Sequence, residues 1–299
     1  MSVTTPPSAS SPREALVGVA LMVGALFTFT LLDASAKWAM REGVPPLEVV
    51  WVRYVGAMVL VFLTAAPDQW REMIRSNRPW MQALRSALLF GSTLLNFLAL
   101  QTLQLAETMS IQFSMPLLVA LSAGPLLGEW IGPRRLIAVL VGFLGVLVVT
   151  RPGVEGFKPA ALYSVAGVFC YAGYILTTRF LAQADTPRTA LLHSTFVGVV
   201  AIAPAMPAVW VSPQSASAVA ALAALAAFGA FGHWLIILAH RRAPAGTLAP
   251  FVYVQIVFMV AAGWLFFGDK PGPNTLAGAA IVIASGLYLL ARERKVKGG

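Results

Sequence analysis

Long apolar runs, separated by short connections rich in proline and glycine, make up most of the chain. A helix needs about 20 mostly apolar residues to cross the hydrocarbon core of a bilayer. Lipid offers no partners to backbone N–H and C=O groups, so continuous runs of this length predict helices rather than open strands. The runs predict ten spans, at 15–34, 46–65, 81–103, 107–127, 134–151, 160–181, 189–210, 216–238, 245–267 and 274–291.

The composition agrees with a chain that is covered by lipid. Of the 299 residues, 58% are hydrophobic and 11% are charged, whereas a soluble domain carries about 25% charged residues. The net charge is +9, but the basic residues form no stripe interleaved with aromatics, so nucleic acid is not an expected partner. The one cysteine, Cys170, lies inside an apolar run, and we expect it to act as a small buried hydrophobic residue. No Cys- or His-rich spacing suggests a metal, and we expect no cofactor.

Basic residues are distributed unequally between the two sides of a ten-span arrangement. Fifteen of the 21 Lys and Arg residues fall on the side of the N-terminus. Because cytoplasmic loops carry the excess of basic residues, both termini are predicted to be cytoplasmic. Residues 1–12 are rich in Ser, Thr and Pro and predict a disordered N-terminus, while residues 292–299 predict a basic tail. We expect the first run to remain as an uncleaved signal anchor.

Two segments match each other at a constant offset of 140 residues. Gly128–Leu136 and Gly268–Leu276 share a Gly, an acid, a Gly-Pro pair and a Leu, and Phe113 falls in step with Tyr253. Gly-Pro alone simply ends helices, but the acid and the Leu in register favour a true duplication. Each match joins the last two of five spans, and halves with an odd number of spans insert in opposite orientations, as in many secondary transporters. The two expected repeats cover 13–152 and 153–291.

The doubled join resembles the drug/metabolite transporter superfamily, in its EamA-type branch. The stretches that carry the resemblance run from Pro116 to Glu129 and from Ala249 to Asp269. Within that branch the chain looks most like the bacterial exporters of aromatic amino acids. The resemblance implies a carrier in the bacterial inner membrane with a central cavity. The third, fourth, eighth and ninth spans would line this cavity, with parts of the first, second, sixth and seventh, and the fifth and tenth spans would lie at the periphery.

Polar residues inside spans are costly and usually face a bundle interior or a cavity. Asp33 and Lys37 are four residues apart near the end of the first run, so they are predicted to pair on one helix face at the water boundary. The alternative is that Asp33 is a proton site or binds an ammonium group of the substrate. Asn96, in the middle of the third run, either binds substrate or hydrogen-bonds a neighbouring helix.

Proline interrupts the fourth and ninth runs. Pro116 leaves the carbonyl of Gln112 without its helical donor and favours a kink. A free backbone acceptor beside an amide side chain suits a zwitterionic substrate, and Phe113 lies next to it. The ninth run repeats this pattern with Pro250, Tyr253 and Gln255. We expect the polar and aromatic members of both sets to contact substrate, and the two prolines to act as helix breaks near the gates.

Further candidates come from the sixth and eighth runs. His233 can titrate near neutral pH and is a candidate for substrate binding or for a proton site, although a lone His is more often a satisfied hydrogen-bonding group. Its neighbour Trp234 is expected to stack on an aromatic ligand. Tyr171 and Tyr174 are one turn apart and are predicted either to line the cavity or to join the aromatic belt at the lipid interface.

These residue types offer donors, acceptors and an apolar slot, which are the groups that a free amino acid requires. We therefore predict an inner-membrane secondary transporter that exports aromatic and other neutral amino acids with broad specificity, by alternating access. A proton-coupled drug or metabolite exporter of the same fold is the alternative. An intramembrane enzyme would need HExxH or paired membrane carboxylates, and the sequence has neither. The chain has no GxxxxGK[ST] loop either, so no ATPase partner is implied.

Overall fold

Helices make up the described part of the computed structural model, and no strand occurs in it. The structure describes residues 12–66, 69–127, 132–151, 157–181, 184–243 and 245–297. Its longer helices are α1 (Pro12–Arg41), α2 (Pro46–Thr64), α4 (Pro79–Leu100), α7 (Pro133–Thr150), α8 (Ala161–Leu181), α9 (Pro187–Ile202), α11 (Ala216–Arg242) and α14 (Pro273–Lys297). The short elements α3 (Trp70–Ile74), η2 (Ala203–Ala205) and α10 (Met206–Val209) lie between these helices, and the remaining elements form the two discontinuous spans described below.

Many helices begin where the sequence places a proline or a capping side chain. Pro46, Pro79 and Pro133 stand in the first turn of α2, α4 and α7, where proline sacrifices no helical hydrogen bond. The side chains of Thr186 and Ser215 accept a hydrogen bond from the backbone N–H three residues further on, at the starts of α9 and α11. The punctuation between apolar runs therefore determines where these spans start.

Eight segments of the described chain are long and apolar enough to cross a membrane. They correspond to the first four and to the sixth to ninth expected runs. The fifth and tenth runs are represented by shorter apolar stretches, Leu136–Thr150 within α7 and Pro273–Leu289 within α14. The chain is thus an all-α multi-pass membrane protein. Residues 1–11 of the expected disordered N-terminus (1–12) and residues 128–131 of the first repeat join lie outside the described residues, and Pro12 begins α1.

Two of the spans are discontinuous. The fourth consists of α5 (Leu105–Gln112) and α6 (Met115–Leu127), and the ninth consists of α12 (Ala245–Leu248), the 3-10 segment η3 (Ala249–Val254) and α13 (Gln255–Phe267). Phe113, at the first interruption, and Tyr253, in the second, occupy matching positions of the repeat. Their rings meet edge to face, with centroids 5.0 Å apart. Both interruptions therefore lie at one place in the bundle.

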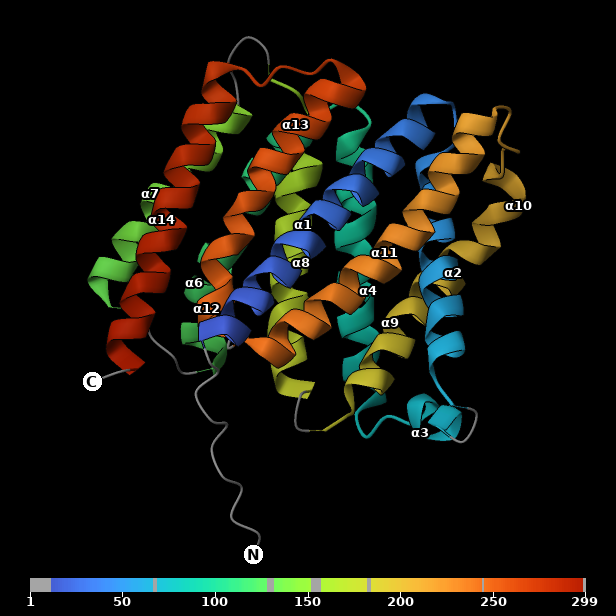
Figure 1. Ribbon diagram of the computed structural model, residues 1–299, viewed down its shortest axis with the longest axis horizontal. Coiled ribbons are helices and arrows are strands. Elements are labelled where there is room, and N and C mark those ends of the chain that lie inside the picture. The colour runs from blue at the N-terminus through green and yellow to red at the C-terminus, as the bar shows by residue number, and fades with distance from the viewer. Residues whose placement is uncertain are drawn as a thin grey trace, which may run out of the picture.

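Helices of the first half pack against helices of the second half in a reciprocal pattern (Figure 1). α1 lies along α11 and α4 lies along α8, while α2 packs on α9 and α7 packs on α14. In terms of the expected runs, these pairs are the first with the eighth, the third with the sixth, the second with the seventh and the fifth with the tenth. If each helix is replaced by its equivalent in the other half, the α1–α11 pair becomes the α4–α8 pair. The α2–α9 and α7–α14 pairs each map onto themselves.

The α7–α14 pair lies at one edge of the bundle, on the left in Figure 1. The two backbones approach closely, since a Cβ on Gly278 would lie 2.6 Å from the carbonyl oxygen of Gly145, and a Cβ on Gly145 would lie 2.9 Å from that of Gly278. Small residues of this kind permit close helix packing in membranes. The pair therefore combines this close backbone approach with a hydrogen bond from Ser285 Oγ of α14 to the carbonyl oxygen of Ala138 in α7.

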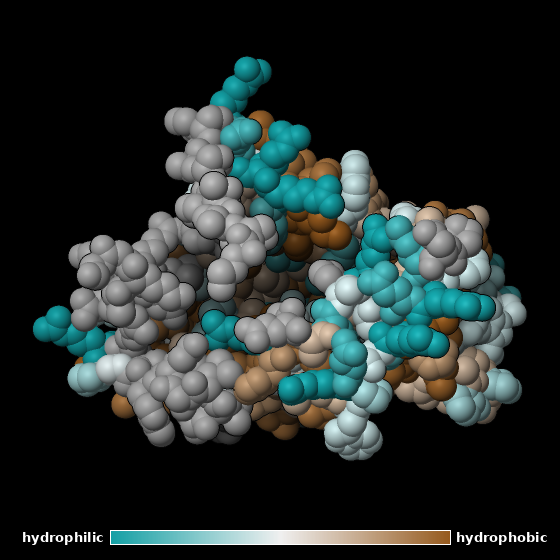
Figure 2. Space-filling model, turned by 90° about the horizontal axis from the view of Figure 1, so that it is seen from below, coloured by the Kyte–Doolittle hydropathy of each residue, from teal (hydrophilic) through white to brown (hydrophobic). Residues whose placement is uncertain are grey.

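The first helix begins and the last helix ends at the same end of the bundle, the lower end in Figure 1, which also carries α3. We call this the α3 end and the opposite one the Asp269 end, after the loop between α13 and α14. Figure 2 views the α3 end and shows hydrophilic residues gathered on the side where α3 lies. These hydrophilic residues suit an end of the bundle that faces water.

Candidate functional site

Three helices bring polar side chains together inside the bundle. Asn96 of α4 donates from Nδ2 to Oδ1 of Asp33 in α1 over 3.4 Å. The Nε2 of Gln112, the last residue of α5, donates to Oδ1 of Asn96 over 2.5 Å. All three side chains remain partly exposed. Asn96 therefore links neighbouring helices, and it still keeps an accessible surface. We call Asp33, Asn96 and Gln112 the amide cluster.

Arg53 of α2 contributes the positive charge at this place. Its charge acts on Asp33, Tyr171 and His233, which belong to three different helices, and its guanidinium lies 5.5 Å from the centre of the Phe97 ring. No ion pair within 4.0 Å joins Arg53 to an acid in the part of the chain that the structure describes. Sequence reasoning missed this residue because it was counted among the basic residues of the connections.

Aromatic rings lie on α8 and α11, the helices that pack against α4 and α1. Tyr171 and Tyr174 of α8 stack with centroids 5.5 Å apart and ring planes 26° apart, and both are partly exposed. The ring of His233 in α11 packs edge to face on Phe29, with centroids 5.1 Å apart. The charge of Arg53 acts on both His233 and Tyr171.

Trp234 is not brought to this centre. It is 53% exposed and packs on Phe231 of its own helix, with ring centroids 5.6 Å apart. Phe231 and Ile237, three residues away on either side, are exposed as well. An exposed apolar face on a helix of a membrane protein is typical of contact with lipid, so Trp234 belongs to the outer surface.

The paired interruptions lie beside buried groups. Phe113 and Tyr253 are 3% and 7% exposed, and Gln255 is buried at the start of α13. The Tyr253 hydroxyl has no hydrogen-bond partner and lies against Gly286 of α14. Pro116 is the second residue of α6 and Pro250 the second of η3. The structure therefore places these residues at the helix breaks, without a side-chain hydrogen bond from Tyr253 or Gln255 to the amide cluster.

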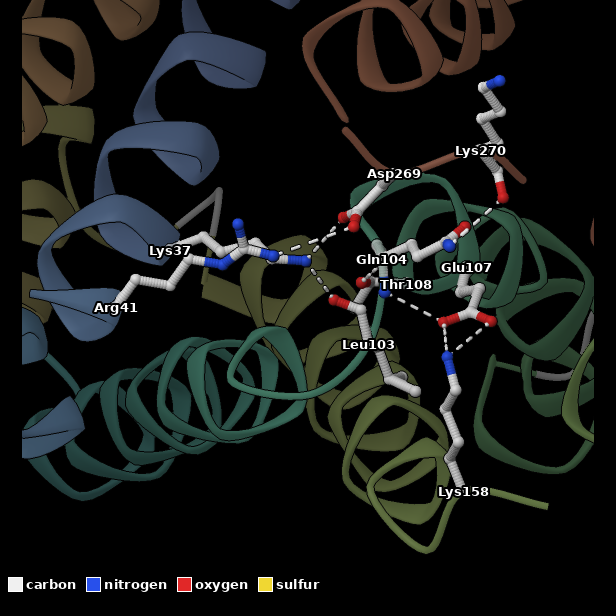
Figure 3. Close-up of polar contacts among 9 residues, drawn as sticks. All are labelled: Lys37, Arg41, Leu103, Gln104, Glu107, Thr108, Lys158, Asp269 and Lys270. Atoms are coloured by element: carbon white, nitrogen blue, oxygen red, sulfur yellow. Dashed lines mark hydrogen bonds and ion pairs between the residues drawn. The ribbon is translucent and has the colours of Figure 1, made fainter. Parts of the chain in front are cut away.

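Ionic contacts join the two halves at the Asp269 end (Figure 3). Lys37 of α1 donates from Nζ to the carbonyl oxygen of Leu103 over 2.7 Å and to Oδ2 of Asp269 over 3.0 Å, with its side chain only 4% exposed. Arg41 lies 3.7 Å from the other carboxylate oxygen. The predicted pairing of Lys37 with Asp33 is wrong, because Lys37 turns towards the loop of the other half while Asp33 turns inward to Asn96.

A second set of contacts stands beside the first at this end. Lys158, before α8, lies 2.9 and 3.0 Å from the two carboxylate oxygens of Glu107 in α5. Gln104, the N-cap of α5, donates from Nε2 to the carbonyl oxygen of Lys270 over 3.2 Å (Figure 3). Every one of these contacts except that to Leu103 joins residues of the first half to residues of the second. We call them the Asp269-end contacts.

The α3 end has its own polar junction. Asp185, between α8 and α9, accepts hydrogen bonds from Ser76 Oγ, the Asn77 backbone N–H and Gln82 Nε2 over 2.5, 2.8 and 2.8 Å. Burial alone would raise the pKa of Asp185, but these donors together hold it below its ordinary value. A cavity of about 690 Å³ adjoins the junction. Its lining consists of Arg71, Glu72, Arg75, Asn77, Ala184, Asp185, Thr186 and Thr189.

Known proteins share both the sequence and the fold. The chain is 26% identical to the riboflavin transporter of Vibrio cholerae, over 96% of this chain and 97% of that protein. It is 25% identical to the S-adenosylmethionine uptake transporter of Rickettsia bellii, over 90% and 93%. It is also 25% identical to the pseudopaline exporter of Pseudomonas aeruginosa, over 93% and 97% of the two chains.

A solved crystal structure superposes on the chain with a TM-score of 0.61 at 20% identity, covering 94% of this chain and 98% of the other. At that identity the likeness concerns the fold alone. The sequence pattern of the EamA-like transporter family matches twice, over residues 16–151 and 158–291. These two matches include all the helices that carry the amide cluster, Arg53 and the Asp269-end contacts. The chain therefore belongs to the EamA-like transporter family.

Proposed function

We propose that this small-molecule transporter is a reversible carrier for metabolites that combine a flat ring with an amino-acid-type ammonium and carboxylate. The observation that carries the proposal is the amide cluster, with one acid and one unpaired arginine beside stacked tyrosines. Aromatic amino acids remain in the proposed class. S-adenosylmethionine also fits, because it joins an amino-acid group to an adenine ring.

Each part of such a substrate finds a matching group. The Asp33 carboxylate attracts an ammonium, and Arg53 attracts a carboxylate with planar donors. Asn96 and Gln112 offer amide donors and acceptors between these charges. The Tyr171–Tyr174 stack presents ring faces and edges to an aromatic group. Because Asp33 and Arg53 are not joined to each other, a zwitterion can satisfy both charges without breaking an ion pair.

We further propose ten spans arranged as two inverted five-helix repeats. The reciprocal pairing of helices and the matching interruptions at Phe113 and Tyr253 support this plan. Polar loop contacts support it too: Asp185 holds the connection before α4 at the α3 end. At the other end Glu42 accepts a hydrogen bond from Ser215 Oγ over 2.6 Å, in the connection before α11. Asp185 follows the first helix of the second repeat, and Glu42 follows the first helix of the first repeat. Each contacts the connection before the third spanning helix of the other repeat, so the two contacts are equivalent, and they lie at opposite ends of the bundle.

The proposed mechanism is alternating access, in which one half moves against the other around the amide cluster. The Asp269-end contacts hold that end closed in the conformation seen here. The helix interruptions near Pro116 and Pro250 supply places where α6 and α13 can change direction, since discontinuous helices lack continuous backbone hydrogen bonding. By the distribution of basic residues, the closed end faces away from the cytoplasm.

Counterflow in proteoliposomes tests the proposal. Vesicles preloaded with unlabelled phenylalanine, tryptophan, S-adenosylmethionine or riboflavin are diluted into a trace of the same labelled compound. We expect transient accumulation of at least one compound that carries both a ring and an amino-acid group, and none in protein-free vesicles. Accumulation of riboflavin alone would contradict the zwitterion requirement. Accumulation that needs an imposed pH gradient would favour the proton-coupled alternative, with Asp33 or His233 as the proton site.

A further inference from the structure

A second arginine lies inside the bundle without an acidic partner. Arg85, in the second turn of α4, is 5% exposed. It donates from Nε to Thr178 over 2.8 Å, and from Nη1 to the Ala190 carbonyl oxygen and Ser194 Oγ over 2.9 and 2.8 Å. Its Nη2 donates to the hydroxyl of Tyr174 over 3.0 Å. None of the ion pairs formed by the described residues includes it.

Such an arrangement leaves a net positive charge in a low-dielectric place. Arginine stays protonated in proteins, and neutral acceptors satisfy its N–H groups without cancelling its charge. Ionisable residues within spans are costly and generally serve a pathway or a site. Arg85 and Arg53 together provide two positive charges along α2, α4 and α8, whereas Asp33 is the one acid that the amide cluster holds.

Tyr174 links the buried Arg85 guanidinium to a partly exposed aromatic surface. Its hydroxyl oxygen already accepts from Arg85, and the guanidinium carbon lies 4.7 Å from the centre of its ring. The hydroxyl proton therefore remains available to an acceptor, and the adjacent cation makes it a stronger donor. Tyr174 is stacked on Tyr171, and both rings are partly exposed.

We propose that the Tyr171–Tyr174 stack, backed by Arg85, is a subsite for an anionic group carried by a ring-bearing substrate. The chemical class is a carboxylate or phosphate attached to an aromatic or heteroaromatic ring. Tyr174 makes the contact with the anion, and Arg85 acts as a positioning residue behind it. This inference rests on the proposed transport function and adds a preference for substrates that carry an extra negative charge.

The test compares molecules that differ only in one anionic group. Riboflavin and riboflavin 5′-phosphate form one pair, and adenosine and adenosine 5′-monophosphate form another. Each compound competes against counterflow of the labelled substrate, and the ratio of half-inhibiting concentrations within a pair measures the anion preference. We expect the phosphorylated member to compete at about tenfold lower concentration in the unaltered protein, the size of a hydrogen bond to a charged group.

Two variants and one control locate the preference. Tyr174→Phe keeps the ring stack but removes the hydroxyl, so the ratio should fall to near one. Arg85→Gln should lower the ratio in the same direction. Tyr163→Phe removes a hydroxyl from an exposed tyrosine of the same helix, outside the stack, and should leave the ratio unchanged. Because only a ratio is compared, a loss of folded protein does not imitate the result.

Three outcomes would overturn the inference. Equal competition by both members of each pair in the unaltered protein would exclude an anion subsite. An unchanged ratio in Tyr174→Phe would place any preference elsewhere. If labelled substrate shows no counterflow at all, the proposed function fails and the inference fails with it, whereas the first two outcomes leave transport intact.

Discussion

At the scale of single residues, the site depends on charges that are close but not paired. Asp33 is held by an amide, and Arg53 by the face of Phe97, so neither charge is cancelled within the protein. Both Arg53 and Arg85 lie inside apolar runs, at 46–65 and 81–103. The positive-inside rule counts both arginines among the basic residues of the loops. Their positions within the runs nevertheless indicate an intramembrane role.

Replacing Asp33 with Asn should weaken the binding of ammonium-bearing substrates. The amide keeps the shape and a hydrogen bond to Asn96 but loses the charge, so affinity should fall about 10- to 100-fold. A ring compound without an ammonium should lose much less. Competition against counterflow measures both, and Trp234→Phe, on the outer surface, is the matched control. Equal losses for the two kinds of ligand would show that Asp33 is structural.

The Asp185 junction should make stability depend on pH at the acid end. Because the pKa of Asp185 in the folded protein is depressed, its stabilising effect is complete above the ordinary carboxyl range, near pH 4. That effect is lost as the pH falls through the lower pKa of the folded state. Thermal unfolding of detergent-solubilised protein measured against pH should therefore show an acid decline that shrinks in Asp185→Asn. The neighbouring Glu72 is exposed, so Glu72→Gln should retain the full acid decline in stability. An acid decline that persists in Asp185→Asn but shrinks in Glu72→Gln would contradict the role of the Asp185 junction.

At the scale of helices, sequence patterns located most spans and the two interruptions. Pro116 and Pro250 marked where the fourth and ninth spans break, because proline cannot continue the helical hydrogen bonding. The patterns did not show which way side chains point. Trp234 neighbours His233 in sequence, yet adjacent residues on a helix lie about 100° apart. His233 therefore packs on Phe29 of α1, whereas Trp234 packs on Phe231 of its own helix. The pairing of Lys37 with Asp269 joins residues 232 positions apart, and no local pattern reports such a contact.

The α7–α14 pair offers a test of packing at this scale. An added methyl group in Gly278→Ala would lie 2.5 Å from a Val149 methyl group and 2.6 Å from the Gly145 carbonyl oxygen. Overpacking of this kind costs about 1–3 kcal/mol of unfolding free energy, and thermal unfolding should show a lower midpoint. Gly132→Ala is the control, because its methyl group would meet nothing within 4 Å. Equal midpoints for the two variants would contradict the close approach.

At the scale of the whole molecule, the two halves interlock instead of standing side by side. The reciprocal pairs of spans, the paired interruptions and the loop contacts at opposite ends support two repeats related by inversion. The offset of 140 residues predicted this duplication from the sequence. The site itself could not be predicted in full, because Asp33, Arg53, Asn96, Gln112, Tyr171 and His233 come from six different spans and meet only after both halves fold together.

The most direct test of alternating access is a cross-link across the closed end. Gln104 and Lys270 contact each other there without belonging to the Lys37–Asp269 pair. The double variant Gln104→Cys, Lys270→Cys is made in a Cys170→Ser background. A short bifunctional thiol reagent that can be cleaved by reduction then joins the two cysteines. Counterflow should stop when the link forms and return when it is reduced, and each single-cysteine variant should be unaffected. Full counterflow with the link in place would contradict a carrier that opens this end in every cycle.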